Sequence, residues 1–550
     1  MEEKIWQLAD RTADDLLTQL LINRGLTASA QQEEFLNPPT PELFACPVRV
    51  PNLNPEEFNK ALSIIKKAIA EDRPIVIHGD YDVDGIGATA ILWETIYFGL
   101  GYKKVYPFIP DRFGEGYGLS KKSLDKINAE YDGLNGNFPL LITVDCGVTA
   151  REEVEYAKKL GFEIVIIDHH VRPETLPRAE ALVWTDSLCS GGLAWFLSYH
   201  LDKASATNQL DLAALTAVAD LQPVLGINRS LLKAGLQALL AGKRLGLQAL
   251  LRSAGVDGRE LGTYELGWII APRLNAAGRL DNALTALRLL CTRDPDQAQT
   301  LAKSLNEVNI ERQKITLEAL THAREHVLSN QPGKILVVAH ETYHEGIIGL
   351  VAGRLTQEFS RPSLVISKGT VISKGSARSV RGFDLVAALK KIEYLFEGLG
   401  GHPMAAGFTV KTENLDKLAV AVADLGEQEL AGDLLKGSIR IDVKISFSRI
   451  NSSLRNLLKQ LEPTGLSNPT PVFLSKGVKV TSSRTVGSSG SHLKLSLEEE
   501  GCRFPAMWFK AGEKLADFPP GTVVDIVYSV GEDSWNGAAR LSLNVKDMRL

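Results

Sequence analysis

The sequence predicts an α/β protein: a parallel-sheet domain, a second α/β domain joined to it by a long helix, and a C-terminal β-barrel. Apolar strands alternate with helices over the first half of the chain, which is typical of a parallel sheet covered on both faces. A long helical pattern follows, and short alternating strands with Gly and Ser turns occupy the last part. The 550 residues are too many for one core, so several domains are expected.

Composition sets bounds on the class of protein. The chain is 44% hydrophobic and 23% charged, which are values of a globular protein. The chain shows no apolar run long enough to span a bilayer, and its N-terminus does not resemble a signal peptide. Five scattered cysteines lack a metal-binding spacing and fit a reducing compartment. We therefore expect a cytoplasmic protein with no membrane partner.

The net charge of −5 does not by itself indicate a nucleic-acid-binding protein, and taken alone it favours a small-molecule enzyme. However, carboxylates that bind cations contribute negative charge, and a basic groove can be local. The charge therefore weakens a nucleic-acid interpretation without deciding the question.

The most informative stretch follows the first predicted strand, Ile75–Ile77, which runs into Asp80, Asp82 and Asp84 and then into glycines. A helix is expected from Ala88 to Leu100. Three crowded carboxylates raise one another's pKa, and a hard divalent cation would hold them ionised together. The alternative is a solvated acidic turn.

Two further predicted strands end in similar residues. Leu140–Val144 runs into Asp145, and Glu163–Ile167 runs into the triplet Asp168, His169 and His170. Because parallel strands place their carboxyl ends at one edge of a sheet, these side chains are expected to converge with those after the first strand. The three loops together predict a metal centre, although each one alone is weak support.

These motifs carry a family resemblance. The three strand ends resemble the DHH phosphoesterase superfamily, and Gly400–Gly407 resembles the signature of its companion DHHA1 domain. The segment Glu462–Pro469 resembles the start of the OB domain of RecJ proteins, with Thr464 and Ser467 in place of an aromatic residue and a glycine. The match beyond about residue 50 is to the RecJ family of single-stranded-DNA exonucleases.

The resemblance implies two divalent metal ions, Mn²⁺ or Mg²⁺, that share Asp145 as a bridging ligand. It assigns the other main ligands to Asp82, Asp84, His169 and Asp220. Either His78 or Asp80 would complete the first metal site, and this choice stays open. His170 is expected to contact the scissile phosphate and Asp168 to hold the neighbouring loop. Without the resemblance, Asp220 would be an ordinary end of the helix Asp211–Val218.

Substrate contacts are predicted in four segments. Each combines small residues with groups that bind phosphate or stack on bases. Their alternatives are a flexible surface loop, a small-residue helix contact or packing at the domain interface. The candidate residues are Arg112, Phe113 and Tyr117; Asn275 and Arg279; Ser376, Arg378 and Ser379; and Gly401 and His402.

The predicted division is an N-terminal extension (1–55), a DHH catalytic domain (56–293), a connecting helix (294–333), a DHHA1 domain (334–432) and an OB-fold domain (436–550). The connecting helix begins with Asp294 as N-cap and Pro295 at its first position. Its polar residues Asn306, Asn309, Arg312 and Gln313 either touch a bound strand or form a solvated face.

The expected function is metal-dependent hydrolysis of single-stranded DNA from the 5′ end to mononucleotides, in recombination and repair. A single-stranded-DNA-binding protein and a helicase are the candidate protein partners. Two alternatives stay open: a DHH phosphodiesterase for oligoribonucleotides or cyclic dinucleotides, and a non-catalytic DNA-binding scaffold. The chain length and the predicted barrel argue against the first, and the complete set of metal motifs argues against the second.

Overall fold

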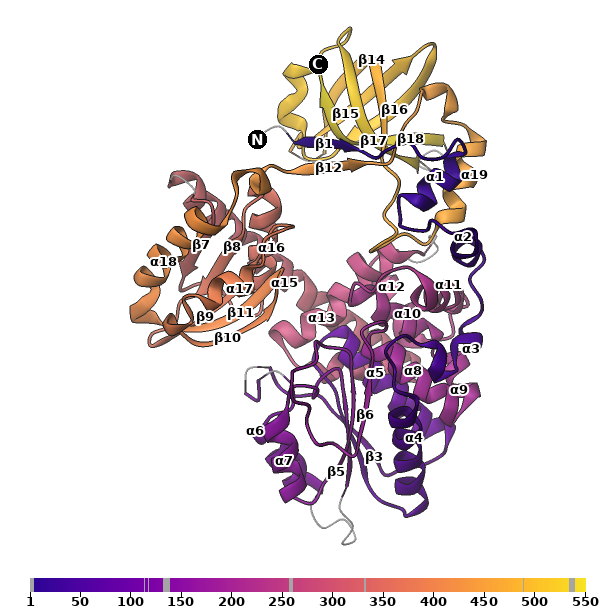
Figure 1. Cartoon of the computed structure of the whole chain (residues 1–550), viewed down its shortest axis with the longest axis vertical. Coiled ribbons are helices and arrows are strands. Elements are labelled where there is room, and N and C mark those ends of the chain that lie inside the picture. Colours follow the sequence, from indigo (N-terminus) through magenta and orange to yellow (C-terminus); the bar gives the residue numbers. More distant parts are fainter. Residues whose placement is uncertain are drawn as a thin grey trace.

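The computed structural model describes residues 4–550 except 113, 117, 132–138, 257–260, 331–332, 488 and 534–539. Two α/β domains and a barrel surround a central region, and both chain ends lie beside the barrel (Figure 1). Helix α15 (Pro295–Ser329) runs from the first α/β domain to the second and matches the predicted connecting helix. Asp294 caps it, accepting hydrogen bonds from the backbone N–H groups of Asp296 and Gln297.

The first domain contains the predicted parallel sheet. Its strands are β2 (Ile75–His78), β3 (Val105–Phe108), β4 (Leu140–Val144), β5 (Glu163–Asp168) and β6 (Ala181–Trp184). Their order is β3-β2-β4-β5-β6, and every neighbouring pair is parallel. The chain winds outward in one direction from β2 to β3 and in the other from β4 onward. The crevice between β2 and β4 is therefore a topological switch point, where ligands bind in such sheets.

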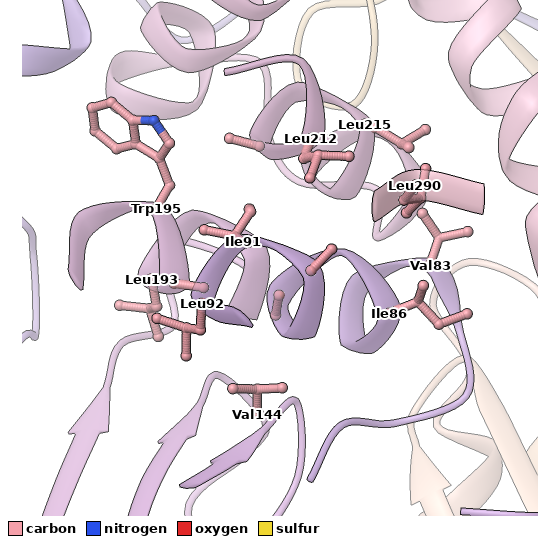
Figure 2. Packing of buried hydrophobic residues seen from close by; sticks show 14 of the residues in the cluster. Val83, Ile86, Ile91, Leu92, Val144, Leu193, Trp195, Leu212, Leu215 and Leu290 are labelled. Atoms are coloured by element: carbon pink, nitrogen blue, oxygen red, sulfur yellow. The ribbon is translucent and has the colours of Figure 1, made fainter. Parts of the chain in front are cut away.

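Helix α5 (Val83–Glu94) is the central helix of this domain. Figure 2 shows it between β4, which carries Val144, and α10 (Leu210–Ala219), which carries Leu212. Helix α8 (Ser190–Leu201) packs along the same core. All the labelled side chains in this view belong to one buried apolar cluster.

The predicted helix Ala88–Leu100 was wrong at its start, whereas the helical run ends at Gly99 with Leu100 as its C-cap. Asp82 caps α5, so the helix begins at Val83, and it becomes a π-helical turn at Thr95–Gly99. The glycines that suggested a loop lie inside the helix. A Cβ atom on Gly85 would approach the backbone N of Asp80 to 2.5 Å, so close packing requires these glycines.

The remaining helices of the first domain cover the sheet and extend toward the barrel. They are α4 (Pro55–Ala70), α6 (Lys121–Tyr131), α7 (Arg151–Lys159), α9 (Lys203–Asn208), α11 (Gly226–Leu240), α12 (Leu245–Ser253), a π-helical segment (Glu265–Ile270), α13 (Ala271–Leu280) and α14 (Leu284–Cys291). Helix α4 buries Phe58, Leu62 and Ile65 along one face. Each helix in the described part of the chain is too short or too polar to cross a membrane.

The second α/β domain has a mixed sheet in the order β10-β11-β9-β8-β7, of which only β7 and β8 are parallel. The segments that contain Ser376 and Gly401 lie on strands β9 and β10. The elements are β7 (Leu336–His340), α16 (Ile348–Phe359), β8 (Ser363–Ser367), β9 (Ile372–Arg378), α17 (Leu385–Lys390), β10 (Phe396–His402), β11 (Ala405–Lys411) and α18 (Leu415–Glu429).

The C-terminal strands form the predicted barrel, which closes through pairing of β14 with both β15 and β17. One expected barrel strand lies elsewhere: β12 (Ser438–Ile441) pairs in parallel with β1 (Ile5–Leu8) at the N-terminus. The other elements are β13 (Val443–Lys444), α19 (Ser452–Leu461), β14 (Phe473–Val486), β15 (His492–Glu499), β16 (Cys502–Trp508), β17 (Val523–Asp533) and β18 (Arg540–Arg549).

The N-terminal segment connects the barrel to the first domain. It contains β1, α1 (Leu16–Ile22), α2 (Ser29–Leu36) and α3 (Pro41–Phe44). Leu20, Leu21 and Phe35 form a buried cluster with Leu461 of α19. The sequence had suggested only an extension lying on the main domain, because the pairing of β1 with β12 joins residues more than 400 positions apart.

Arg229 of α11 is the main polar contact of this junction. Its guanidinium is buried and donates to the carbonyl of Phe35 at 2.7 Å and to the carbonyls of residues 460–463 at 2.8–3.2 Å. Those carbonyls stand at the C-terminal end of α19, where the helix dipole favours a cation. One side chain thus joins the first domain, the N-terminal segment and the chain leading into the barrel.

We predict that Arg229→Met lowers the free energy of unfolding by about 3 kcal/mol, because it leaves several buried carbonyls without a donor. The midpoint of thermal or urea unfolding of the full chain measures this effect. Arg252→Met, at an exposed arginine on neighbouring α12, is the matched control and should leave the midpoint unchanged. Equal midpoints for the two variants would contradict the assigned role of Arg229.

Candidate metal centre and adjoining cleft

The carboxyl ends of β2, β4 and β5 meet at the topological switch point, as the sequence predicted. Helix α10 adds Asp220 from the opposite side, immediately after its last residue. The structure therefore brings together side chains spread over some 140 positions of the chain. They are Asp80, Asp82, Asp84, Asp145, Asp168, His169, His170 and Asp220.

Asp82 is held by the start of helix α5. Its Oδ1 accepts hydrogen bonds from the backbone N–H groups of Asp84 and Gly85, at 2.9 and 3.2 Å. The side-chain oxygen of Asn275 in α13 accepts a hydrogen bond from the backbone N–H of Val83, the first residue of the helix, at 3.0 Å. Burial, followed by the charge of Asp84, raises the pKa of Asp82 above its ordinary value. Asn275 thus supports the cap of α5 and positions the loop.

Asp84 is fixed by the N-terminus of helix α8. Its two oxygens accept hydrogen bonds from the backbone N–H groups of Ser190 and Gly191, both at 2.8 Å. Its Oδ2 lies 3.6 Å from Nε2 of His169. Two backbone donors at a helix N-terminus stabilise the ionised form of a buried carboxylate.

Asp145 has a left-handed backbone conformation, with φ of 63°. Its Oδ1 accepts a hydrogen bond from the hydroxyl of Ser190 at 3.1 Å and lies 3.2 Å from Nε2 of His169. Burial raises the pKa of Asp145 well above its ordinary value, and the charges of Asp84 and Asp82 add to this effect. A nearby cation would therefore offset the repulsion that Asp145 experiences from Asp84 and Asp82.

The potential ligand atoms form three overlapping groups, each with all its atoms within 4.8 Å of one another. Asp145 and His169 each belong to two of the groups, so together they link all three, and the Asp145 carboxylate lies between the Asp80–Asp82 pair and His169. The buried Asp80 Oδ1 has no hydrogen-bond partner among the described residues, so this donor set fits a cation. The groups are Asp80, Asp82 and Asp145; Asp84, His169 and Asp220; and Asp145, His169 and His170.

His78 lies behind this cluster and belongs to none of the three groups. Its ring stacks on Phe108, with centroids 5.3 Å apart, and its Nδ1 lies 3.7 Å from Sγ of Cys146. Burial lowers the pKa of His78 to about 4, so the ring is neutral at pH 7. Of the two candidates for completing the first metal site, the geometry favours Asp80.

His170 is paired with the carboxylate of Asp168. Its Nδ1 lies 2.7 Å from Oδ1 of Asp168, whose other oxygen accepts the backbone N–H of Val148 at 2.9 Å. Burial opposes protonation of the ring, but the bond to Asp168 outweighs it and raises the pKa of His170 to about 9. A cationic imidazolium suits a phosphate better than a metal ion, although His170 stands within reach of Asp145 and His169.

Asp220 is partly accessible, with 28% of its side chain exposed. Gln222 donates to its Oδ2 at 2.7 Å. Burial, followed by the charge of Asp84, raises the pKa of Asp220 to about 6. Ser190 and Gln222 were not predicted, because only the packing of α8 and α10 beside α5 brings them to the centre.

A cleft of about 920 Å³ adjoins the metal centre and separates the two α/β domains. The first domain contributes Tyr81, Arg112 and Arg279 to its lining, and the second contributes Ser376 and Arg378. Four residues from three of the predicted substrate-binding segments therefore face one space. The guanidinium of Arg112 lies over the ring of Tyr81, 5.0 Å from its centroid.

The arginines of this cleft are held by neutral groups. Arg279 donates to the carbonyl of Gly346 at 3.0 Å, and Arg378 donates to the hydroxyl of Ser376 at 3.2 Å. Burial, followed by the charge of Arg112, lowers the pKa of Arg279 to about 10. Within the described ranges neither arginine has a carboxylate within 4.0 Å. Although Glu115, Glu153 and Glu345 also line the cleft, guanidinium groups that lack a carboxylate partner are suited to binding phosphates.

Other predicted substrate residues stand apart from the cleft. The hydroxyl of Ser379 is buried and donates to the carbonyl of Phe383 at 2.7 Å. His402 is exposed at the β10–β11 hairpin. Gly401 has a φ of 142° there, and a Cβ atom would approach the Ala405 carbonyl to 2.2 Å, so the hairpin requires glycine. Phe113 and Tyr117 lie outside the described residues.

Comparisons with known proteins agree with this architecture. Family models match residues 74–220 (DHH family, N-terminal domain), 332–427 (DHHA1 domain) and 441–547 (RecJ OB domain). The single-stranded-DNA-specific exonuclease RecJ of Bacillus subtilis is 32% identical over 97% of this chain and 67% of its own length. The Escherichia coli protein of the same name is 31% identical over 90% of this chain and 89% of its own.

Among solved structures, the crystal structure of RecJ from Thermus thermophilus in complex with Mn²⁺ matches with a TM-score of 0.83 and 27% identity. That match covers 99% of this chain and 79% of the crystallised one. The predicted resemblance is thereby confirmed, as are the parallel-sheet domain, the second α/β domain and the barrel. The chain belongs to the RecJ family.

Proposed function

We propose that the protein is a metal-dependent exonuclease specific for single-stranded DNA. The observation that carries this proposal is the set of overlapping ligand groups, linked through Asp145 and His169, beside an arginine-lined cleft. Its membership of a family whose relatives are named single-stranded-DNA-specific exonucleases supports the substrate. The barrel supplies a second surface for a single strand, in the manner of other OB-folds.

The centre fits two divalent cations. Asp80 and Asp82 would hold one, Asp84, His169 and Asp220 the other, with Asp145 between them. Such ions supply a Lewis acid for the phosphoryl oxygens and acidify a water for attack on phosphorus. An imidazole among the ligands favours Mn²⁺ over Mg²⁺, although both are candidates.

The chain's own residues bind and orient the strand. The imidazolium of His170 donates a hydrogen bond to the scissile phosphate, and Asp168 holds its ring. Arg279 and Arg378 bind neighbouring phosphates of the strand in the cleft. Their geometry is fixed in advance by the carbonyl of Gly346 and the hydroxyl of Ser376, so little ordering is required on binding.

We further propose that degradation proceeds from the 5′ end and releases mononucleotides, in recombination and repair. Ser376 and Arg378 line the same cleft as Tyr81, which stands between Asp80 and Asp82 in the chain, and this supports a short path from a bound 5′ end to the scissile bond. A single-stranded-DNA-binding protein and a helicase are the proposed partners, because such an enzyme needs exposed single strands.

The test of the function is an assay with single strands of DNA and RNA, labelled at either end, in Mn²⁺ or Mg²⁺. We expect mononucleotides from the 5′ end of DNA and little cleavage of duplex. Cleavage confined to cyclic dinucleotides or very short RNA would support the phosphodiesterase alternative. Binding without cleavage in either metal would support a scaffold.

Asp145→Asn should abolish nuclease activity and the tight binding of a metal pair. Asparagine tolerates the left-handed conformation of this position, so the substitution removes charge with little backbone strain. A buried aspartate with a raised pKa destabilises the ionised native state at pH values above its unfolded pKa, and asparagine removes that cost. In chelator, therefore, the variant should melt at or above the wild-type temperature.

Isothermal titration with Mn²⁺ and melting curves with and without the metal measure both effects. Asp186→Asn, at an exposed aspartate after β6, is the matched control. Near-wild-type turnover by folded Asp145→Asn would show that this carboxylate does not bridge two ions.

Arg378→Ala should selectively reduce kcat/KM on 5′-phosphorylated strands. A charge-assisted contact is worth roughly 1.5–3 kcal/mol, so the advantage of these strands over 5′-hydroxyl strands should shrink on the order of tenfold or more. Lys390→Ala, at an exposed lysine of α17, is a control with the same loss of charge. If Arg378 instead supports the domain interface, both substrates lose equally and the melting temperature falls.

The barrel prediction concerns Phe509, a 58% exposed aromatic residue whose ring packs edge-on to His492. Arg484 and Lys494 stand opposite each other on β14 and β15 nearby. Phe509→Ala should weaken binding of long single strands by about 1–2 kcal/mol, since base stacking is worth that much, while turnover at saturation stays unchanged.

Fluorescence anisotropy with labelled oligonucleotides measures the affinity, and kcat measures the turnover. The control is Val523→Ala, at another exposed apolar residue of the barrel. Equal affinities of Phe509→Ala and wild type would exclude Phe509 from the strand-binding surface.

A further inference from the structure

A group of arginines lies where helices α13, α15 and α16 pack together, outside the lining of the cleft. Arg312 of α15 donates from Nε and Nη2 to Oδ1 of Asn309, at 3.2 and 2.9 Å. Arg273 of α13 donates from Nε to Oδ1 of Asn306 at 3.0 Å. The amide that orients Arg312 lies one turn earlier on the same helix, and the amide that orients Arg273 lies on the neighbouring helix α15. Because both amides are neutral, they do not compensate the charge of either guanidinium.

Other arginines of helix α15 and of the first domain have carboxylate partners. Arg324, also on α15, forms an ion pair with Glu358 of α16 at 2.6 Å. Arg244, which is more deeply buried, is paired with both Glu94 and Asp211. Over the part of the chain that the structure describes, Arg273, Arg312 and Arg354 make no such pair. Helices α15 and α16 therefore present opposite charges at one contact and like charges at another.

The positive charges of Arg273, Arg312 and Arg354 repel one another. Burial lowers the pKa of Arg312, and the charges of Arg354 and Arg273 lower it further. Placing three guanidinium groups together without an anion costs free energy in the free protein. A bound anion would remove that cost.

Asn309 gives an independent indication of a missing acceptor. The residue is completely buried, and its Nδ2 has no hydrogen-bond partner among the described residues. Its Oδ1 is already engaged by Arg312, so the amide orientation is set. An unpaired buried N–H donor is uncommon, and here it stands beside a guanidinium that lacks a counter-ion.

This group of arginines extends the positively charged region that begins in the cleft. The charge of Arg312 is among those that lower the pKa of Arg279, which lines the cleft itself. Helix α16 begins at the cleft with Ile348 and Gly349 and carries Arg354 about one and a half turns later. A strand that leaves the cleft along α16 would meet Arg354 and Arg312 next.

We propose that Arg312, with Arg273, Arg354 and the amide of Asn309, binds an internal phosphodiester of the single strand. This inference rests on the proposed nuclease function and adds a second phosphate site, distinct from the end-binding pocket at Arg378. A nucleic-acid backbone suits the site because it carries one charge per nucleotide and supplies an anion here while another phosphate occupies the cleft. The polar stripe of the connecting helix is thus a binding surface.

The test compares wild type with Arg312→Gln in binding of single-stranded oligonucleotides in chelator over a range of salt concentrations. We expect affinity for long strands to fall on the order of tenfold, equally for 5′-phosphate and 5′-hydroxyl ends. The slope of log affinity against log salt should decrease by about 0.7, the value for one phosphate contact on a single strand. Inhibition of cleavage by a mononucleotide should not change, because one nucleotide fills only the cleft.

Three further variants keep the result decisive. Arg312→Lys should retain the salt slope, since it keeps the charge. Lys314→Gln, at an exposed lysine paired with Glu311 on the same helix, should behave as wild type. Arg354→Gln changes an exposed side chain and should weaken binding in the same salt-dependent way, even where Arg312→Gln fails to fold.

An unchanged salt slope in Arg312→Gln and Arg354→Gln would overturn the inference while leaving the nuclease function intact. Weaker inhibition by the mononucleotide would place Arg312 in the end-binding pocket and would also overturn it. Failure of the wild type itself to bind or cut single strands would instead refute the proposed function.

Discussion

The mutual repulsion of carboxylates at the carboxyl edge of the first sheet is the constraint on which the rest of the structure depends. Four aspartates of the centre have pKa values raised by burial and by one another, so the folded chain holds them together at a cost. The fold meets this cost with fixed donors: Asp82 caps α5, and Asp84 accepts two backbone N–H groups of α8. The glycines of α5 allow close packing around this centre, because a Cβ atom on Gly85 would meet the backbone of Asp80 and one on Gly87 would meet Thr216 of α10. Divalent cations complete the compensation.

Much of this arrangement could be predicted from the sequence, because apolar runs that end in acidic residues have one straightforward explanation in a parallel sheet. Asp145 and His169 were identified in this way, and the connecting helix α15 was identified from its helical pattern and its cap. The start of α5 was missed because Gly85 and Gly87 suggested a loop, whereas they are there for close packing. Ser467 stands where the family pattern has glycine, and it adopts a φ of 62°, so the altered residue keeps the backbone conformation.

The features that sequence could not supply are those that depend on contacts between distant segments. Ser190 and Gln222 carry no motif and reach the metal centre only through the packing of α8 and α10. The pairing of β1 with β12 and the contacts of Arg229 join residues hundreds of positions apart. For the same reason Ser379, which shares a glycine-rich segment with Arg378, turns into the core while its neighbour faces the cleft. Adjacent residues of an extended chain point to opposite sides, so Ser379, immediately after the end of β9, faces away from the cleft that Arg378 lines.

The arginines of this protein illustrate how the same side chain serves structure and binding. Arg244 has two carboxylates, and Arg229 has backbone carbonyls at a helix end, so both are satisfied within the folded chain. Arg279, Arg312 and Arg378 are oriented by a carbonyl, an amide and a hydroxyl, which fix direction without neutralising charge. In a chain with a net charge of −5, such uncompensated groups are concentrated in one region between the two α/β domains. The net charge therefore gives little information about the substrate. Arginines that lack carboxylate partners indicate where a polyanion binds.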